Sequence, residues 1–366
     1  MKKILHAQKI KGVVREISLS EPKIFRNNEK LCRSGHVGHG LAEFEDGKII
    51  DFYANNSPLR FDGHSGYGWW EYKISEDHGK TFGEGRKFPY SWESFLNGCH
   101  NAFVEKVVSK KDGRIIAFCT TGSLTSQICC EPYYEPKSVI SEDGGKTWSE
   151  PYTVSPYRGR IFDAKYHDGK IYVLQFCNDA EESFYGNKPE HKYRIFTSND
   201  EKTFIEESEV AFPDTVGRAY GNMVFTANGE LIVYAYNVND EKNMDYAISK
   251  DGGKTWAETG NSYVAKNIRN PQVGILDGQY ILHGRSGENE RGAGGFVLYT
   301  SADGIKWDEG TMLIEGKSAC FYSNNLTIKS PDGKERMLVQ YSENIKDPFT
   351  GWSGRVNVMH LWIESV

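Results

Sequence analysis

The feature that most constrains the fold of this chain is a short polar turn that recurs along it. The pattern Ser-x-Asp-x-Gly-x-Thr-aromatic occurs as SEDHGKTF at 75–82, SEDGGKTW at 141–148 and SKDGGKTW at 249–256. Shortened copies are SNDEKTF at 198–204 and SADGIKW at 301–307. Successive copies begin 66, 57, 51 and 52 residues apart. A period near 50 residues is typical of stacked supersecondary units rather than of unrelated domains.

A second turn, Asp-Gly or Asn-Gly between two apolar runs, precedes or follows each copy. Such dipeptides favour tight hairpins, because Gly adopts positive φ and Asp or Asn bonds to the backbone that follows. Each unit therefore contains four antiparallel strands, which is the content of one propeller blade. The six turns lie at 46–47, 112–113, 168–169, 228–229, 277–278 and 332–333.

We therefore expect an all-β chain in which residues 1–366 form one domain, a six-bladed β-propeller with four-stranded antiparallel blades. The segment KGVVREISL at 11–19 has no hairpin partner of its own, whereas the last unit ends in RVNVMHLWIESV at 355–366 without an outer turn. Pairing between these two segments would close the ring and remove exposed sheet edges. An open solenoid or a pair of β-sandwiches is the alternative.

Charge and apolar content exclude several classes of partner. The chain has 44 Lys and Arg against 50 Asp and Glu, a net charge of −6, and no basic block. Nucleic acid and an anionic membrane are therefore not expected as partners. No run reaches the roughly 18 apolar residues of a membrane span. Lys9 and Lys11 interrupt the N-terminal apolar stretch, so we expect a cytoplasmic protein, with a secreted mature form as the alternative.

The seven cysteines are irregularly spaced and include no Cys-x-x-Cys pair. They are expected to be buried thiols, and neither a metal site nor a cofactor is predicted from them.

The recurring turn resembles the Asp-box, or BNR, repeat of the sialidase superfamily. The resemblance extends from about Ser34 to Glu343 and implies a six-bladed propeller with a site at the centre of one face. It also implies a catalytic set: three arginines for a substrate carboxylate, a Tyr nucleophile with a Glu partner, and an Asp acid/base.

Several positions match that set. The stretch GKSACFYSNNLTIKSPDG at 316–333 places Tyr322 at the nucleophile position. Asp62, thirteen residues before Ser75, matches the loop of the acid/base Asp. The segment LHGRSGENERGAGGFVLYTS at 282–301 offers Arg285 or Arg291 as an arginine of the trio. A core tyrosine and a turn aspartate are the structural alternatives for the first two.

Other positions depart from the set. His36 and His39 stand where the first arginine is expected. The strand expected to carry the Glu is GRAYGNMVFTANG, with Arg218, Tyr220 and Asn222, and the following hairpin has Tyr236 in place of the second arginine. The arginine trio is thus incomplete.

In a propeller, the first residues of each inner strand face the central axis. Here they are polar just ahead of apolar cores, which is the composition of a sugar site. These positions are His36, His39, His100, Asn101, Arg160, Asp163, Arg218, Tyr220, Asn222, Arg269, Asn270, Tyr322 and Asn324. The histidines do not predict a metal site, since residues three apart on a strand face opposite ways. His36 or His100 is instead a candidate general acid or base.

Three functions remain open. The first is a sialidase-like exo-glycoside hydrolase that removes a terminal sugar, with acidic sugars among the candidates, from an oligosaccharide or glycoside. The second is a polysaccharide lyase that acts on a uronate-containing glycan through His36 or His100 with Tyr322. The third is a non-catalytic sugar-binding propeller.

Overall fold

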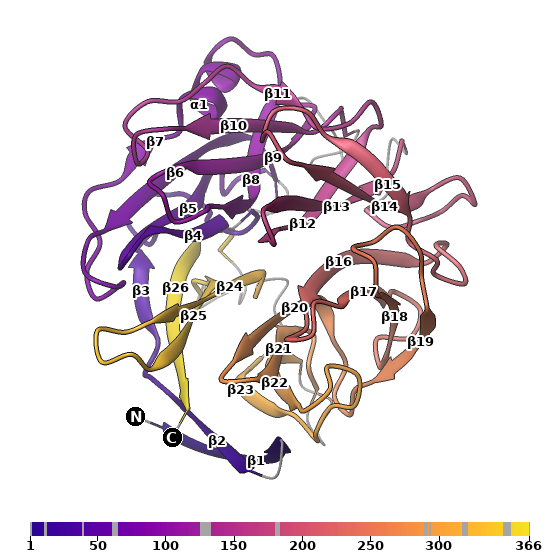
Figure 1. The fold of residues 1–366 in the computed structure, drawn as a ribbon. Coiled ribbons are helices and arrows are strands. Elements are labelled where there is room, and N and C mark those ends of the chain that lie inside the picture. Colours follow the sequence, from indigo (N-terminus) through magenta and orange to yellow (C-terminus); the bar gives the residue numbers. More distant parts are fainter. Residues whose placement is uncertain are drawn as a thin grey trace.

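Six antiparallel sheets are arranged around a central axis in the computed structural model (Figure 1). The structure describes the backbone of residues 2–10, 13–38, 40–60, 65–124, 133–179, 184–288, 292, 294–316, 321–346 and 353–365, with side chains from residue 16 onward.

Five of the sheets are built from four consecutive strands each, ordered from the axis to the rim. Blade 1 contains β4 (Gly40–Glu45), β5 (Lys48–Asn56), β6 (Gly68–Ser75) and β7 (Arg86–Lys87). Blade 2 contains β8 (Asn101–Val108), β9 (Ile115–Gly122), β10 (Lys137–Ser141) and β11 (Tyr152–Thr153). Blade 3 contains β12 (Gly159–His167), β13 (Lys170–Cys177), β14 (Lys192–Ser198) and β15 (Ile205–Glu209). Blade 4 contains β16 (Arg218–Phe225), β17 (Leu231–Asn237), β18 (Asn243–Ser249) and β19 (Glu258–Tyr263). Blade 5 contains β20 (Arg269–Leu276), β21 (Gln279–Arg285), β22 (Gly295–Ser301) and β23 (Thr311–Glu315).

Blade 6 joins the two ends of the chain. Its inner strands are β24 (Ser323–Lys329), β25 (Glu335–Asn344) and β26 (Val356–Ser365). The outer edge of β26 pairs with β2 (Val13–Leu19) and β3 (Lys23–Arg26), and β1 (Lys2–Ile10) extends the sheet from β2. The inner strands contact one another in the order β4, β8, β12, β16, β20, β24 and back to β4. The ring is therefore closed, and the predicted pairing of the N-terminal segment with the last blade is confirmed.

Each recurring turn forms a small hydrogen-bonded box between the third and fourth strands of its blade. In blade 4, Asp251 Oδ1 accepts from the Thr255 N–H at 2.9 Å, and its Oδ2 accepts from the Thr255 hydroxyl at 2.6 Å. Ser249 Oγ donates to Asp251 and accepts from the Gly253 N–H, both at 2.8 Å. The aromatic residue then reaches the preceding blade: Trp256 Nε1 donates to the Glu209 carbonyl at 2.8 Å. The boxes thus connect adjacent blades.

Five inner strands carry a β-bulge or register shift, at Glu43/Glu45, Val104/Lys106, Ile161/Asp163, Ala219/Gly221 and Arg269/Gln272. A bulge leaves one residue unpaired and re-aims its side chain. Tyr220 and Asn270 lie at two of these bulges with φ of 34° and 51°, in the left-handed region. The unpaired residues Glu105 and Tyr220 place polar groups beside Arg160, whereas the unpaired Phe162 packs in the apolar core.

One helix lies within the described residues, α1 (Pro89–Leu96), between β7 and β8. Pro89 suits the first helical position, where no N–H bond is required. No helix among the described residues has the length and apolarity needed to cross a membrane. The expectation of buried thiols is wrong for Cys32 and Cys99, which are exposed, whereas Cys119 and Cys177 are buried.

Candidate active site

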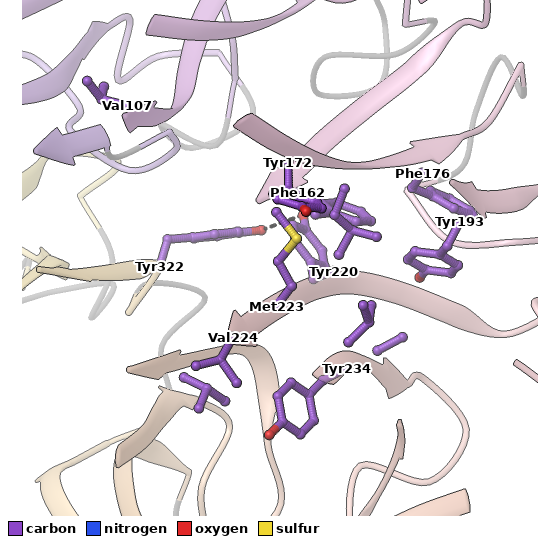
Figure 2. Close-up of a cluster of buried hydrophobic side chains, with 14 of the residues drawn as sticks. Val107, Phe162, Tyr172, Phe176, Tyr193, Tyr220, Met223, Val224, Tyr234 and Tyr322 are labelled. Carbon is purple, nitrogen blue, oxygen red and sulfur yellow. Dashed lines mark hydrogen bonds between the residues drawn. The ribbon is translucent and has the colours of Figure 1, made fainter. Parts of the chain in front are cut away.

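Tyr322 lies at the axis, immediately before β24. Its backbone is held by Ser342, whose Oγ accepts from the Tyr322 N–H at 3.1 Å and whose N–H donates to the Tyr322 carbonyl at 3.0 Å. The Tyr322 hydroxyl lies 3.1 Å from the Tyr220 hydroxyl, and Figure 2 shows the two rings meeting across the axis. The Arg285 guanidinium lies 4.6 Å from the centre of the Tyr322 ring, and His36 meets that ring edge-on at 4.7 Å.

Tyr220 connects Tyr322 to an ion pair. Arg160 Nη1 donates to the Tyr220 hydroxyl at 3.0 Å, and Arg160 Nε donates to the Glu105 carboxylate. Burial opposes the charge of Arg160, but Glu105 together with the neighbouring tyrosines Tyr220 and Tyr133 outweighs it, and the pKa of Arg160 lies well above its usual value. Burial, followed by the neighbouring Tyr322, raises the pKa of Tyr220 well above its usual value. Arg160 thus stays charged and Tyr220 stays protonated.

A second arginine and a carboxyl group flank the phenols. Arg269 Nη2 donates to the Tyr236 hydroxyl at 3.4 Å, and Arg269 Nε lies 3.3 Å from Glu241 Oε1. Tyr236 stacks on Tyr220 with ring centres 6.0 Å apart. Burial raises the pKa of Glu241, although Arg269 and Arg285 favour its charged form. Glu241 is therefore a carboxyl group suited to holding a proton nearer to neutral pH.

Nine residues around the axis form what we call the axial cluster, and every blade or its leading segment contributes to it. Its tyrosines and Arg160 and Arg285 are each less than a tenth exposed. Three guanidinium groups against two carboxylates give it an excess of positive charge. The nine members are Tyr322 at the centre and, around it, His36, Glu105, Arg160, Tyr220, Tyr236, Glu241, Arg269 and Arg285.

A second polar layer lies further along the inner strands and supports the first. Lys106 Nζ donates to Gln272 Oε1 at 2.5 Å and to Asn324 Oδ1 at 2.8 Å, and lies 3.6 Å from Asp163 Oδ1. Asp163 Oδ2 accepts from Asn222 Nδ2 at 2.6 Å. Burial lowers the pKa of Lys106 to about 8, against the pull of Asp163. This axial network ties together the inner strands of blades 2 to 6.

The structure brings some of the predicted residues together and holds others apart. His36, Arg160, Tyr220, Arg269, Arg285 and Tyr322 lie in the axial cluster, and Asp163, Asn222 and Asn324 lie in the axial network. His39, Asp62 and Arg291 lie outside the described residues.

Three predicted residues have partners away from Tyr322. His100 Nε2 lies 3.0 Å from the Tyr90 hydroxyl on α1, and burial lowers the pKa of His100. Arg218 pairs with Asp245 at 2.6 Å, and Asn101 Nδ2 donates to the Ser123 carbonyl at 3.2 Å. Strand position alone predicted that these side chains point toward the axis. In the structure each of them instead bonds to a nearby partner away from Tyr322.

Sequence reasoning missed Glu105, Lys106 and Glu241. The first two are adjacent charges inside the buried strand NAFVEKVV, where a charged residue requires a partner. That requirement is the signal that could have identified them. Glu241 lies in a polar turn, NVNDEKN, and nothing in its surroundings distinguishes it in the sequence.

Within the described residues, one group of side chains has the geometry of a metal site. Ligand atoms of Glu43, Asp46 and His78 lie within 4.8 Å of one another. Glu43 Oε1, however, accepts from the Gly47 N–H at 3.0 Å, and its Oε2 accepts from the Lys111 ammonium group. The Lys111 ammonium group already neutralises the Glu43 carboxylate, so this cluster is explained by an ion pair within the protein.

Comparisons with known proteins agree with this architecture. The model of the BNR/Asp-box repeat matches residues 139–150. No curated protein sequence matches the chain. A protein of unknown function from Dyadobacter fermentans DSM 18053 is 16% identical with a TM-score of 0.65, over 95% of this chain and 99% of that one. The Hadza microbial sialidase Hz136 is 14% identical with a TM-score of 0.66, over 97% and 69%.

A third similar structure is the GH93 α-L-arabinofuranosidase of Fusarium graminearum in complex with arabinobiose. It is 13% identical with a TM-score of 0.64, over 94% of this chain and 98% of that one. The chain is therefore a six-bladed β-propeller with BNR/Asp-box repeats, and it shares this fold with sialidases and arabinofuranosidases.

Proposed function

We propose that the protein is a glycoside hydrolase that cleaves a terminal sugar residue at the axial cluster, with Tyr322 as the nucleophile. The observation that carries the proposal is the contact between the hydroxyl groups of Tyr322 and Tyr220, where Tyr220 accepts from Arg160 and Arg285 lies beside the Tyr322 ring. The similar structures named as a sialidase and an arabinofuranosidase support the class of reaction.

The direction of the hydrogen bonds favours negative charge on the Tyr322 oxygen. Arg160 can only donate, so the oxygen of Tyr220 accepts from Arg160 and the Tyr220 proton is free to point at Tyr322. A phenolate at Tyr322 would receive that hydrogen bond and would lie beside the positive charge of Arg285. Both effects stabilise the nucleophilic form of the side chain.

In the proposed first step, Tyr322 Oη forms a bond to the anomeric carbon while the glycosidic C–O bond breaks. The leaving oxygen must take a proton from a carboxylic acid. Asp62 is the candidate from the sequence resemblance, and Glu241 is the candidate among the described residues, because its pKa is raised. Water then attacks the anomeric carbon and gives a proton to the carboxylate left by the first step. The bond to Tyr322 breaks, and Tyr322 is released as the phenolate that began the cycle.

The surplus of guanidinium groups favours a sugar with an anionic substituent. Arginine presents a planar pair of donors to a carboxylate. Arg269 and Arg285 both act on Tyr236 and Glu241, so they lie on the same side of the cluster. A neutral terminal sugar such as arabinofuranose has no carboxylate that could pair with this excess of positive charge.

The test is a panel of aryl glycosides that includes a sialoside, a glucuronide and an α-L-arabinofuranoside, with release of the aryl group as readout. We expect the acidic sugars to be cleaved. Tyr322→Phe should lower kcat/KM by at least about 100-fold. The exposed Tyr263→Phe is the matched control. Full activity in the Tyr322→Phe variant would remove the assignment, and formation of an unsaturated uronate would replace hydrolysis with elimination.

A further inference from the structure

A separate hollow of about 440 Å³ lies where the ring closes, between blade 6 and blade 1. It is formed by the first Asp-box turn, by Lys73 on β6, by β3 and by the outer part of β25 and β26. None of its lining residues belongs to the axial cluster. They are Ser20, Lys23, Ile24, Phe25, Lys73, Gly79, Lys80, Thr81, Phe82, Arg336, His360 and Trp362, and we call this hollow the closure pocket.

The closure pocket is lined by charges of one sign. Lys23, Lys73, Lys80 and Arg336 lie in its wall, and no carboxylate is among the lining residues given above, all of which belong to the described part of the chain. Two of these cations contact neutral oxygens: Lys73 Nζ donates to the Phe25 carbonyl at 2.8 Å, and Arg336 donates to the His78 carbonyl. In a chain with a net charge of −6, such a concentration of positive charge marks an anion site.

Acidic groups do lie behind the wall. His360 Nε2 lies 2.8 Å from Asp51 Oδ2, and Asp51 is fully buried. Glu71 and Asp51 favour the charged form of Lys73, whereas burial, followed by Arg26, lowers its pKa. Asp51 and Glu71 thus compensate the charge of Lys73, and Glu364, Asp332 and Asp77 act on Arg336, whereas Lys23 and Lys80 are exposed.

The same pocket offers aromatic surfaces. Trp362 lies over Gly79, where a Cβ atom would come within 2.8 Å of the indole, and Arg336 lies 4.1 Å from the centre of a Trp362 ring. Phe82 packs against Phe25 with ring centres 5.0 Å apart. Aromatic faces beside cationic donors are what a sugar with an anionic group requires, since its C–H face stacks while its charge is neutralised.

The Asp-box at this joint carries a phenylalanine instead of a tryptophan, as the third box does with Phe204. Trp148, Trp256 and Trp307 each donate an indole N–H to the preceding blade, at 3.2, 2.8 and 2.8 Å. The first box has Phe82, which is smaller and has no donor; it packs on Phe25 and on His360. The joint that closes the ring therefore lacks the bond that these three boxes make.

We propose that the closure pocket binds an anionic saccharide, bearing a carboxylate or a sulfate group, at a site distinct from the axial cluster. The choice of a saccharide rests on the proposed function, whereas the choice of an anion rests on the lining residues alone. The volume of about 440 Å³ falls within the range of about 300–1,000 Å³ typical of ligand pockets. A bound ligand contacts both blade 1 and blade 6, so it stabilises the closed ring.

The experiment measures binding in the Tyr322→Phe variant, so that a cleavable probe is not consumed. Isothermal titration uses digalacturonate and glucose 6-sulfate as the two anionic probes and glucose as the neutral one. We expect saturable binding of at least one anionic probe, a higher unfolding temperature in its presence, and no binding of glucose. The two anionic probes distinguish a carboxylate site from a sulfate site.

Charge-reversal variants locate the binding. Lys23→Glu combined with Lys80→Glu should weaken binding by about tenfold or more, since both charges face the ligand. Lys254→Glu, at the position of Lys80 in the fourth box, is the matched control and should leave binding unchanged. Arg269→Ala should leave the binding that depends on Lys23 and Lys80 unchanged, because Arg269 belongs to the axial cluster, where any additional binding of the anionic probes would take place.

Three results would overturn the proposal: no saturable binding of either anionic probe, undiminished binding in the Lys23→Glu/Lys80→Glu variant, or loss of binding in the Arg269→Ala variant. The proposed hydrolysis is tested separately, by the aryl-glycoside activity of the protein without any of these substitutions. Activity without binding sinks the closure pocket alone, and binding without activity sinks the hydrolase alone.

Discussion

The Asp-box turns and the axial cluster are both made of polar side chains, but their contacts span very different lengths of chain. In the fourth box, Ser249 and Asp251 are two residues apart, and Asp251 and Thr255 are four apart. At the axis, Tyr220 and Tyr322 are 102 residues apart. Contacts within a turn form whenever the turn forms. Contacts at the axis require the whole ring, and they are therefore where a change should be most costly.

The largest effect is expected where a charge of the axial network is removed. Asp163→Ala would leave Lys106 buried without its carboxylate and should cost about 3–5 kcal/mol of unfolding free energy. Urea unfolding measures this loss. Lys106→Met added to that variant should restore part of it, because the uncompensated charge is gone. If Asp163→Ala lost no more unfolding free energy than a substitution in an Asp-box turn, the expected difference between the axis and the turns would be contradicted.

The next effect concerns activity. Tyr220→Phe removes the hydroxyl that contacts Tyr322 and accepts from Arg160, and it keeps the aromatic ring of the side chain. We expect kcat/KM on the best aryl glycoside to fall by about 10- to 100-fold. Unfolding free energy should change by only about 1–2 kcal/mol. The control is Tyr166→Phe, at a partly exposed tyrosine on β12. An equal fall of kcat/KM in both variants would argue against a catalytic role for the Tyr220 hydroxyl.

A substitution in a single Asp-box should lower the unfolding free energy less than removal of a charge from the axial network. Asp251→Ala removes the acceptor of the Thr255 N–H and hydroxyl and should cost about 1–2 kcal/mol of unfolding free energy. Aryl-glycosidase activity should be unchanged, since the boxes lie away from Tyr322. Paired urea and activity measurements on this variant decide the point, and a catalytic defect with normal stability would mean that a box contributes to the site.

The smallest effect is the dependence of the boxes on pH. Hydrogen bonds lower the pKa values of Asp143, Asp200 and Asp251 to about 2, below the usual value near 4. Because these folded-state values are depressed, the stabilisation is present above pH 4 and is lost as pH falls toward 2. Unfolding midpoints of the parent and of Asp251→Asn should converge over that interval. A constant difference between them would contradict the assignment.

Much of the fold could be predicted from the residues. The six hairpin turns, the repeated boxes and the unpaired ends were enough to expect six four-stranded blades and their closure, and the structure confirms both. The pairing of β3 with β26 was not expected, because the run KIFR is short and has no turn signal on either side. Its place is decided by the free edge of β26.

Less of the candidate site could be predicted. Position at the start of an inner strand selected Arg160, Tyr220 and Tyr322, which contact one another or a shared neighbour. The same criterion selected His100 and Arg218, which turn to α1 and to Asp245 instead. Strand position fixes where a backbone passes, whereas a bulge or a nearby partner decides where its side chain points.

By itself, the sequence determined the repeated turns, the number of blades and the way the ring closes, since each depends on residues a few positions apart or on the two ends of the chain. Only the tertiary structure decided that Glu105, Arg160, Tyr220 and Tyr322 form one connected group. The physical reason is that these residues come from blades 2, 3, 4 and 6, so they meet only when the blades are assembled around one axis. No local pattern encodes those contacts.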